Sequence, residues 1–206
     1  MAKAIFGLQK PDSGCIRIHG EEAAIHSVRD AIHRGIGYLT EDRTLRGLCL
    51  SLSVRDNLVS PSMDRFTAPT GIVNDREIDR YAGGMVERYS IVTPSIHQTM
   101  VTLSGGNQQK VLLGMWLGIQ PAVFIADEPT KGVDVGAKEE IYRHINDLAA
   151  RGVAVMLISS DLNELLGMSD RICVMRDGHI QKILPADEAT EEVIISYALG
   201  AGEVMR

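Results

Sequence analysis

Residues 103–110 read Leu-Ser-Gly-Gly-Asn-Gln-Gln-Lys, at the point where a loop gives way to a helical pattern of apolar residues. Ser104 suits the N-cap of that helix, and the two glycines that follow let backbone N–H groups approach an anion with no Cβ in the way. A Ser-Gly-Gly turn alone is usually an ordinary cap. The longer string Leu-Ser-Gly-Gly-x-Gln, however, arises by chance only about once per million positions. The segment therefore predicts a phosphate-binding turn.

A second motif follows about twenty residues later, where residues 123–130 read Val-Phe-Ile-Ala-Asp-Glu-Pro-Thr. Ligands of open α/β sheets lie beyond the carboxyl ends of the strands, so an acid there can reach a phosphate-bound Mg²⁺. A neighbouring acid can orient or deprotonate a water. Asp127 suits the metal and Glu128 suits the water. Alone, such acids are more often solvated loop residues, but the preceding glycine motif favours the chemical role.

Outward from these motifs, helical and strand patterns alternate, which predicts a parallel sheet covered by helices. The expected helices cover 28–34, 107–117, 138–150, 162–166 and 188–199, and the expected strands cover 15–19, 35–39, 122–126, 153–159 and 171–175. Asp177-Gly178 predicts a hairpin turn. Helical pieces at 53–58 and 78–89, separated by prolines, indicate a helical subdomain over 51–103. Residues 1–50 and 104–206 then form one α/β core.

Composition restricts the class of protein. The chain has 206 residues, is 45% hydrophobic and has a formal net charge of −6, which is typical of one globular domain and argues against coating nucleic acid by bulk electrostatics. No uncharged apolar run reaches the roughly 18 residues of a membrane helix. Trp116 and the methionines at 115, 156 and 175 are expected in the core. The cluster Arg43, Arg46 and Arg55 is typical of a solvated face.

Together with Lys131-Gly132-Val133-Asp134 and the Asp177-Gly178 turn, these motifs resemble the nucleotide-binding domain of an ABC ATPase. The sequences of these motifs are similar to those in the second of two fused domains of bacterial sugar importers of the ribose, galactose and xylose type. The resemblance extends from Ala2 to about Gly200. It implies a P-loop NTPase-like fold, ATP and Mg²⁺ as cofactors, and ATP hydrolysis coupled to transport.

The resemblance also implies roles for individual residues. Residues that would contact the γ-phosphate of ATP held by a second domain are Ser104, Gly105, Gly106 and Gln108. Val133 and Asp134 would lie in the segment that crosses the dimer interface. Asp127 would hold Mg²⁺, and Glu128 would act on the water.

Two positions depart from the usual family pattern. Glu41 stands where most ABC domains have Gln; it is either a contact to a metal-bound water or the membrane partner, or a solvated loop acid, and the residues favour neither. Ser160 stands where a His would hold the γ-phosphate. A serine donates one hydrogen bond but cannot replace an imidazole, and the alternative role is to cap the helix that starts at Leu162.

A third departure is that no G-x-x-x-x-G-K-[ST] phosphate loop occurs in the sequence. In the family that loop directly precedes the segment matching Ala4–Leu8. We therefore expect this chain to begin downstream of it, without the first strand and the loop. Residues 1–206 alone are expected to hydrolyse little ATP.

The partners that the resemblance implies are a second ABC nucleotide-binding domain, membrane permease subunits and, indirectly, a sugar-binding protein, but no nucleic acid. The protein would lie peripherally on the cytoplasmic face of the plasma membrane, where the arginine cluster resembles the surface that docks onto the membrane subunits. Two alternatives remain open. One is a non-catalytic remnant or regulatory partner that supplies only the Ser104 motif. The other, less favoured because no coiled-coil heptads occur, is a soluble ABC-type ATPase of DNA repair or translation.

Overall fold

The computed structural model describes residues 1–200 and divides into two compact units. The first unit is Met1–Met156, and the second begins at Leu157. Each unit is described by itself. No helix among residues 1–200 has both the length and the apolar character needed to cross a membrane.

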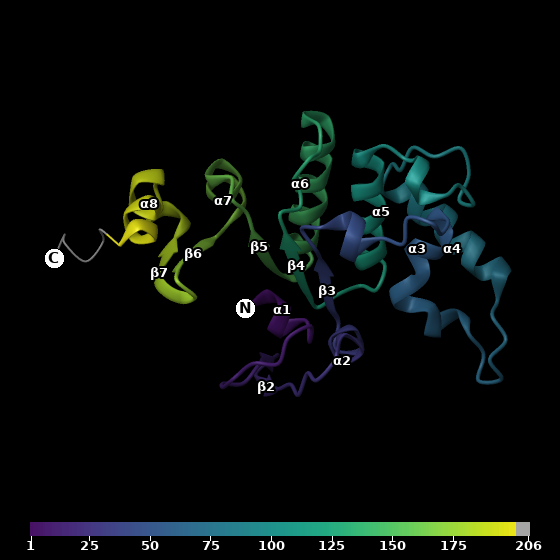
Figure 1. Ribbon diagram of the computed structural model, residues 1–206, viewed down its shortest axis with the longest axis horizontal. Coiled ribbons are helices and arrows are strands. Elements are labelled where there is room, and N and C mark those ends of the chain that lie inside the picture. The colour runs from purple at the N-terminus through teal and green to yellow at the C-terminus, as the bar shows by residue number, and fades with distance from the viewer. Residues whose placement is uncertain (201–206) are drawn as a thin grey trace. The chain divides into compact units, whose positions relative to one another are not determined.

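The first unit combines a parallel sheet with helices (Figure 1). Its helices are α1 (Ala2–Ile5), α2 (Val28–His33), α3 (Val54–Val59), α4 (Asp75–Arg88), α5 (Gly105–Leu117) and α6 (Val135–Ala150). Its strands are β1 (Arg17–Ile18), β2 (Glu21–Glu22), β3 (Ile36–Leu39), β4 (Val123–Asp127) and the start of β5 (Ala154–Ile158). Short turns of other helix types cover Arg43–Gly47 (η1), Ser60–Phe66 (η2) and Met100–Thr102 (η3).

The central sheet has the strand order β3-β4-β5. Strands β3 and β4 are parallel, with Ile36 opposite Val123 and Leu39 opposite Ala126. All four residues of β3 are buried, as expected for a strand of a parallel sheet that is covered on both faces. The pairing confirms the predicted parallel sheet, and it brings the carboxyl ends of β3 and β4 to one edge.

Helix α5 runs through the interior of the unit. It packs on β3 and on α3, and Leu112 and Leu113 are fully buried. An apolar residue set on all sides of a helix is typical of burial between other elements. The phosphate-binding turn predicted at its N-terminus is therefore attached to one of the most buried helices of the fold.

Helices α3 and α4 pack together beside α5 (Figure 1). Arg55 on α3 forms ion pairs with Asp56, Asp75 and Asp79, the last two on α4. Its side chain is only 14% exposed, so the prediction of a solvated face is wrong for Arg55. The reason is that three carboxylates replace the water that such a guanidinium would otherwise bind.

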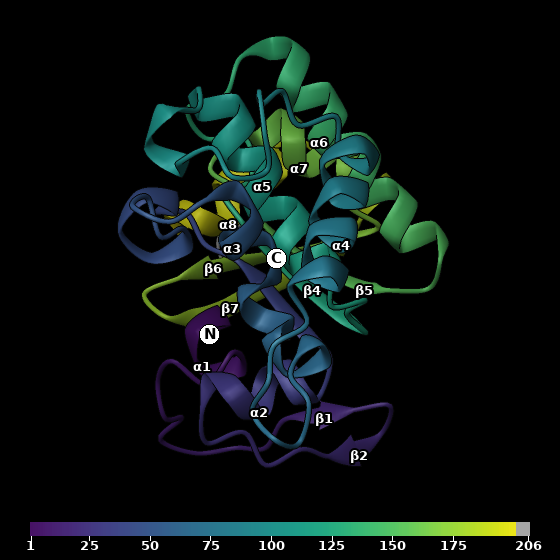
Figure 2. The ribbon, with the colours of Figure 1, turned by 90° about the vertical axis from the view of Figure 1, so that its right-hand side faces the viewer.

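The β1–β2 ribbon and α2 lie at the end of this unit away from α6 (Figure 2). Arg17 pairs with Glu22 and Ile18 with Glu21 in antiparallel fashion. The predicted strand over 15–19 thus forms only its central two residues.

The second unit contains α7 (Leu162–Met168), the antiparallel strands β6 (Arg171–Arg176) and β7 (His179–Pro185), the short turn η4 (Ala186–Glu188) and α8 (Glu191–Leu199). Asp177 and Gly178 have φ of 50° and 78°, as a two-residue hairpin turn with positive φ at both positions requires. This confirms the predicted turn. The predicted helix over 188–199 begins instead at Glu191, after its N-cap Thr190.

The alternation of buried and exposed side chains along β6 explains why the prediction that Met175 lies in the core is wrong. Ile172 and Val174 are buried with Leu184 and Ile194 in the core of the second unit. Met175 lies on the opposite face of the strand and is 41% exposed, because successive side chains of a strand point to opposite faces. Trp116 and Met115 are buried as predicted.

Candidate functional site

Ser104 begins α5 as its N-cap. Its hydroxyl accepts a hydrogen bond from the backbone N–H of Asn107 and another, over 3.0 Å, from the Asn107 side chain. The residue is exposed, so the turn presents both a hydroxyl and the first N–H groups of a helix to the surroundings. This is the local geometry in which a helix N-terminus binds an anion.

The glycines after Ser104 allow two charged side chains to approach the turn. A Cβ on Gly105 would lie 2.6 Å from Nη2 of Arg43, and a Cβ on Gly106 would lie 3.4 Å from Oδ2 of Asp134. At Gly105 a side chain would displace Arg43, so that position needs glycine, whereas the distance at Gly106 is an ordinary van der Waals contact. The structure thus brings Gly105, Gly106 and Asp134, all predicted site residues, into one cluster.

Arg43 is a site residue that the sequence did not identify. Its Nη1 donates to the carbonyl oxygen of Lys131 over 3.3 Å, and its Nε is buried with no hydrogen-bond partner among the described residues. The expected solvated face is therefore wrong for Arg43 as well. Only its place just after a strand end, in Thr40-Glu41-Asp42-Arg43, could have indicated a role at the site.

Gln108 and Gln109 both point into the protein. Gln108 is 8% exposed, and its amide donates to the carbonyl oxygens of Met100 and Leu103, over 3.1 and 3.2 Å. Gln109 donates to the carbonyl oxygen of Pro129 over 2.6 Å. Gln108 therefore holds the segment before the turn in this structure, and its contact with a phosphate stays a prediction. The role of Gln109 was missed.

Asp127, the last residue of β4, and Glu128, which follows it, lie at the sheet edge that the sequence predicts. Asp127 is half-buried, and its Oδ2 accepts a hydrogen bond of 2.7 Å from the hydroxyl of Tyr38 on β3. Glu128 has a φ of 50°, a left-handed conformation that costs a non-glycine residue of order 1 kcal/mol or more. Backbone strain of this kind is concentrated at functional sites and supports a special role for Glu128.

Glu41 forms an ion pair with Lys131, whose Nζ lies 2.7 Å from Oε1 of the carboxylate. Both side chains are more than half exposed. The hydrogen bond and the charge of Lys131 lower the pKa of Glu41, and the same contact raises the pKa of Lys131. The sequence predicted for Glu41 either a contact to a metal-bound water or the membrane partner, or a solvated position, and neither role includes this ion pair. The ion pair joins the segment after β3 to the segment after β4.

Val133 and Asp134 directly precede α6. Asp134 is its N-cap and accepts from the backbone N–H of Ala137 over 3.0 Å. Ser160 lies in the second unit and is exposed. The N-cap of α7 is Asp161, which accepts from the N–H groups of Asn163 and Glu164, so the alternative in which Ser160 caps that helix is wrong. The carboxylate of Asp161, next to Ser160 in the sequence, accepts the hydrogen bonds from these N–H groups instead.

The residues at the end of β4 fit a Mg²⁺ ion that is bound together with a nucleotide. Among the described residues, no group of three or more His, Cys, Asp or Glu side chains could enclose a metal ion. Mg²⁺ usually keeps several waters and is held by one or two carboxylates together with substrate phosphates. Asp127, at a sheet edge, suits a metal that arrives with a nucleotide and does not form a cage of protein ligands.

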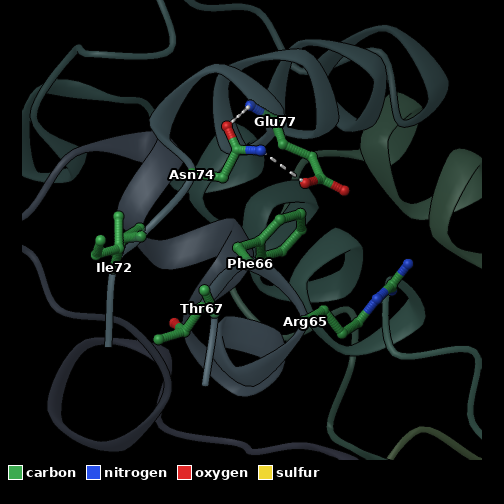
Figure 3. Close-up of a pocket in the computed structure, with 8 residues that line it drawn as sticks. Arg65, Phe66, Thr67, Ile72, Asn74 and Glu77 are labelled. Atoms are coloured by element: carbon green, nitrogen blue, oxygen red, sulfur yellow. Dashed lines mark hydrogen bonds between the residues drawn. The ribbon is translucent and has the colours of Figure 1, made fainter. Parts of the chain in front are cut away.

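A hollow of about 480 Å³ lies elsewhere in the first unit (Figure 3). It is lined by Arg65, Phe66, Thr67, Ala68, Ile72, Val73, Asn74 and Glu77. At its edge, Asn74 is the N-cap of α4: its side-chain oxygen accepts from the Glu77 N–H, and its side-chain amide donates to the Glu77 carboxylate. None of the predicted site residues lines this hollow.

Comparison with known families agrees with this arrangement. The profile described as ABC transporter matches residues 1–131, more than half of the chain. The chain belongs to the ABC transporter family. The predicted family resemblance is thus confirmed.

Two curated relatives of this ABC transporter chain are named as sugar import proteins. It is 48% identical over 198 residues to the ribose import ATP-binding protein RbsA of Lactococcus lactis subsp. lactis (strain IL1403), covering 96% of this chain and 40% of the relative. It is 46% identical over 198 residues to a putative ribose/galactose/methyl galactoside import ATP-binding protein of Geobacillus kaustophilus (strain HTA426), covering 96% of this chain and 39% of that relative. The chain therefore spans about two fifths of the length of these relatives.

Solved structures support the same fold. The ABC chain matches the ATP-binding cassette MJ1267 with a TM-score of 0.77 and 22% identity, over 97% of this chain and 80% of that one. It matches a dimeric, post-hydrolysis state of MJ0796 bound to ADP and Pi with a TM-score of 0.73 and 21% identity, over 89% and 78% of the two chains. The predicted P-loop NTPase-like α/β fold is confirmed.

Proposed function

We propose that this chain is part of the ATP-binding subunit of an importer for ribose or a related sugar. The observation that carries the proposal is the 48% identity to a ribose import ATP-binding protein over 96% of the chain. It is supported by the Ser104 turn at the N-terminus of buried α5 and by Asp127 and Glu128 at the end of β4. In this proposal residues 51–103 are the helical subdomain of one nucleotide-binding domain, and 1–50 and 104–206 are its α/β core.

The Ser104 turn would bind the γ-phosphate of an ATP held by a second nucleotide-binding domain. Its donors are the Ser104 hydroxyl and the N–H groups around Gly105 and Gly106, where the partial positive charge of the helix N-terminus favours an anion. Val133 and Asp134, which lie against Gly106, would meet the second domain at the same interface.

Asp127 would hold Mg²⁺, which when bound neutralises charge on the phosphate oxygens. Glu128 would orient the attacking water and accept its proton. Glu128 directly follows Asp127, the last residue of β4, and has a left-handed backbone conformation, which supports a special role. Ser160 would donate one hydrogen bond in the place where a histidine is usual, and Glu41 would reach a metal-bound water only after leaving Lys131.

The remaining partners follow from the proposed function. Membrane permease subunits would use the energy of ATP hydrolysis, and a sugar-binding protein would deliver the substrate to them. The chain would then lie peripherally on the cytoplasmic face of the membrane.

Sugar uptake tests the proposal. Cells that lack the natural chain containing these residues are complemented with wild type, with Glu128→Gln, or with Glu139→Gln as the matched control on the exposed side of α6. Wild type and Glu139→Gln should restore uptake of radiolabelled ribose, whereas Glu128→Gln should reduce it by about 100-fold or more, because the water loses its base.

Either of two results would contradict this. If no variant restores uptake of any pentose or hexose, the transport proposal fails. If Glu128→Gln transports like wild type while Ser104→Arg does not, the chain contributes only its Ser104 turn to another domain's site, as the regulatory alternative requires.

A further inference from the structure

Tyr38 and Asp127 form a hydrogen bond that the proposed roles do not use. The hydroxyl of Tyr38 donates to Oδ2 of Asp127 over 2.7 Å. Tyr38 lies on β3 opposite Ile125 of β4, so its side chain reaches along the neighbouring strand to the last residue of β4. The contact therefore joins the two strands at the edge where the phosphate chemistry is proposed.

Aromatic packing fixes the position of the Tyr38 ring. Tyr38 is 3% exposed, and its ring centroid lies 5.1 Å from that of Phe6 just after α1. Phe6 in turn meets Trp116 of α5 edge to face, with centroids 5.3 Å apart. Such aromatic pairs have preferred geometries. The hydroxyl therefore has a place set by β3 and a packed aromatic cluster rather than by a mobile loop.

The hydroxyl of Tyr38 is the donor of this hydrogen bond, and Oδ2 of Asp127 is the acceptor. A neutral phenol beside a carboxylate is a hydrogen-bond donor, and it leaves the negative charge on Asp127 in place.

We propose that Tyr38 is a positioning residue that holds Oδ2 of Asp127, so that Oδ1 is the oxygen left to bind Mg²⁺. The inference rests on the proposed function, in which Asp127 is the metal ligand. Groups that hydrogen-bond a metal ligand fix its orientation, and their removal typically weakens metal binding by about 10- to 100-fold. In this proposal Tyr38 itself would touch neither the metal nor the nucleotide.

Metal affinity provides a test that is separate from turnover. The longest natural chain that contains these residues is prepared as Glu128→Gln, to stop hydrolysis, with Tyr38 intact or as Tyr38→Phe. Mn²⁺ binding in the presence of ATP is followed by the EPR signal of free Mn²⁺, and ATP binding without metal is measured in EDTA. Tyr38→Phe keeps the ring that packs on Phe6 and removes only the oxygen.

The expected result is a 10- to 100-fold weaker Mn²⁺ affinity for Tyr38→Phe, with ATP affinity in EDTA changed less than about 2-fold. Tyr89→Phe is the matched control, because Tyr89 is also buried, at 4% exposed, and its ring packs against His144. It should leave both affinities unchanged.

Three results would overturn the inference. Unchanged Mn²⁺ affinity in Tyr38→Phe would show that the hydrogen bond does not orient Asp127. An equal loss of ATP affinity in EDTA would show a general structural role. If the parent Glu128→Gln chain and its Asp127→Asn version bind Mn²⁺ with ATP equally well, Asp127 is not the ligand, and the proposed role of Asp127 fails together with this inference.

Discussion

Gln109 and Pro129 connect the Ser104 turn to the end of β4. The side chain of Gln109, 3% exposed, donates to the backbone carbonyl oxygen of Pro129 over 2.6 Å. Because Gln109 belongs to the first turns of α5 and Pro129 follows Glu128, one buried hydrogen bond fixes the spacing between the two motifs. Neither motif alone would reveal this contact.

Gln109→Leu should destabilise the protein by about 1–3 kcal/mol, since it leaves the buried carbonyl oxygen of Pro129 without its donor. Urea unfolding measures the change. Gln9→Leu, at an exposed loop position, is the control and should stay within about 0.5 kcal/mol of wild type. Equal effects of the two substitutions would show that the Gln109 contact contributes nothing to stability.

Arg43 and Gly105 should show strong energetic coupling. In the wild-type background, Gly105→Ala places a Cβ 2.6 Å from Nη2 of Arg43, so the guanidinium must move away from the carbonyl oxygen of Lys131. With Arg43→Ala already present, the new methyl meets no such neighbour, and Gly105→Ala becomes neutral or slightly stabilising because it restricts the unfolded chain. The four unfolding free energies should give a coupling of about 0.5–3 kcal/mol.

The matched comparison for this cycle is Gly84→Ala with Arg43→Ala, because Gly84 also lies in a helix and a Cβ there meets nothing within 4 Å. Those two changes should be additive within about 0.5 kcal/mol. Additivity of Gly105→Ala with Arg43→Ala as well would mean that Arg43 does not restrict the turn.

The sequence predicted the parts of this molecule that depend on local patterns. The cap at Ser104, the strand ending at Asp127 and the hairpin at Asp177-Gly178 each need only neighbouring residues, and each is found in the structure. Segments of two residues, such as β1 and β2, lie below the length at which alternation indicates a strand.

The contacts that complete the candidate site could not be predicted in the same way. Tyr38 and Asp127 are 89 positions apart, and Arg43 and Lys131 are 88 apart. Their meeting depends on the pairing of β3 with β4, which side-chain type and spacing do not encode. For Arg43, charge also suggested solvent exposure, whereas the glycine at position 105 provides space for a half-buried guanidinium.

Substitutions of two N-cap serines, Ser53 and Ser104, should distinguish an effect on stability from an effect on sugar uptake. Ser104 caps α5 and Ser53 caps α3, each by accepting from the N–H of the residue three positions later. Replacement of either by Ala should cost about 0.5–2 kcal/mol of unfolding free energy. Only Ser104→Ala should also reduce sugar uptake in the complementation assay, because only its hydroxyl belongs to the proposed phosphate-binding turn. Similar uptake by the two variants would argue against a phosphate contact of Ser104.

Acid should selectively remove the contribution of Asp56 to stability. The hydrogen bond from the Ser53 hydroxyl lowers the pKa of Asp56, and the hydrogen bond and charge of Arg55 lower it further, against burial, which raises it. A carboxyl whose pKa is lower in the folded state stabilises the fold above its unfolded pKa of about 3.9. That stabilisation is lost as the pH falls through the lower, folded value.

The difference in unfolding free energy between wild type and Asp56→Asn should therefore be constant from about pH 7 to about pH 5 and should shrink below about pH 4. Asp187→Asn, at an exposed position in the second unit, provides the background effect of the same change of side chain. If the difference in unfolding free energy between wild type and Asp56→Asn grew on acidification, the prediction would be contradicted. Such a result would show that the contacts with Ser53 and Arg55 favour the protonated form of Asp56.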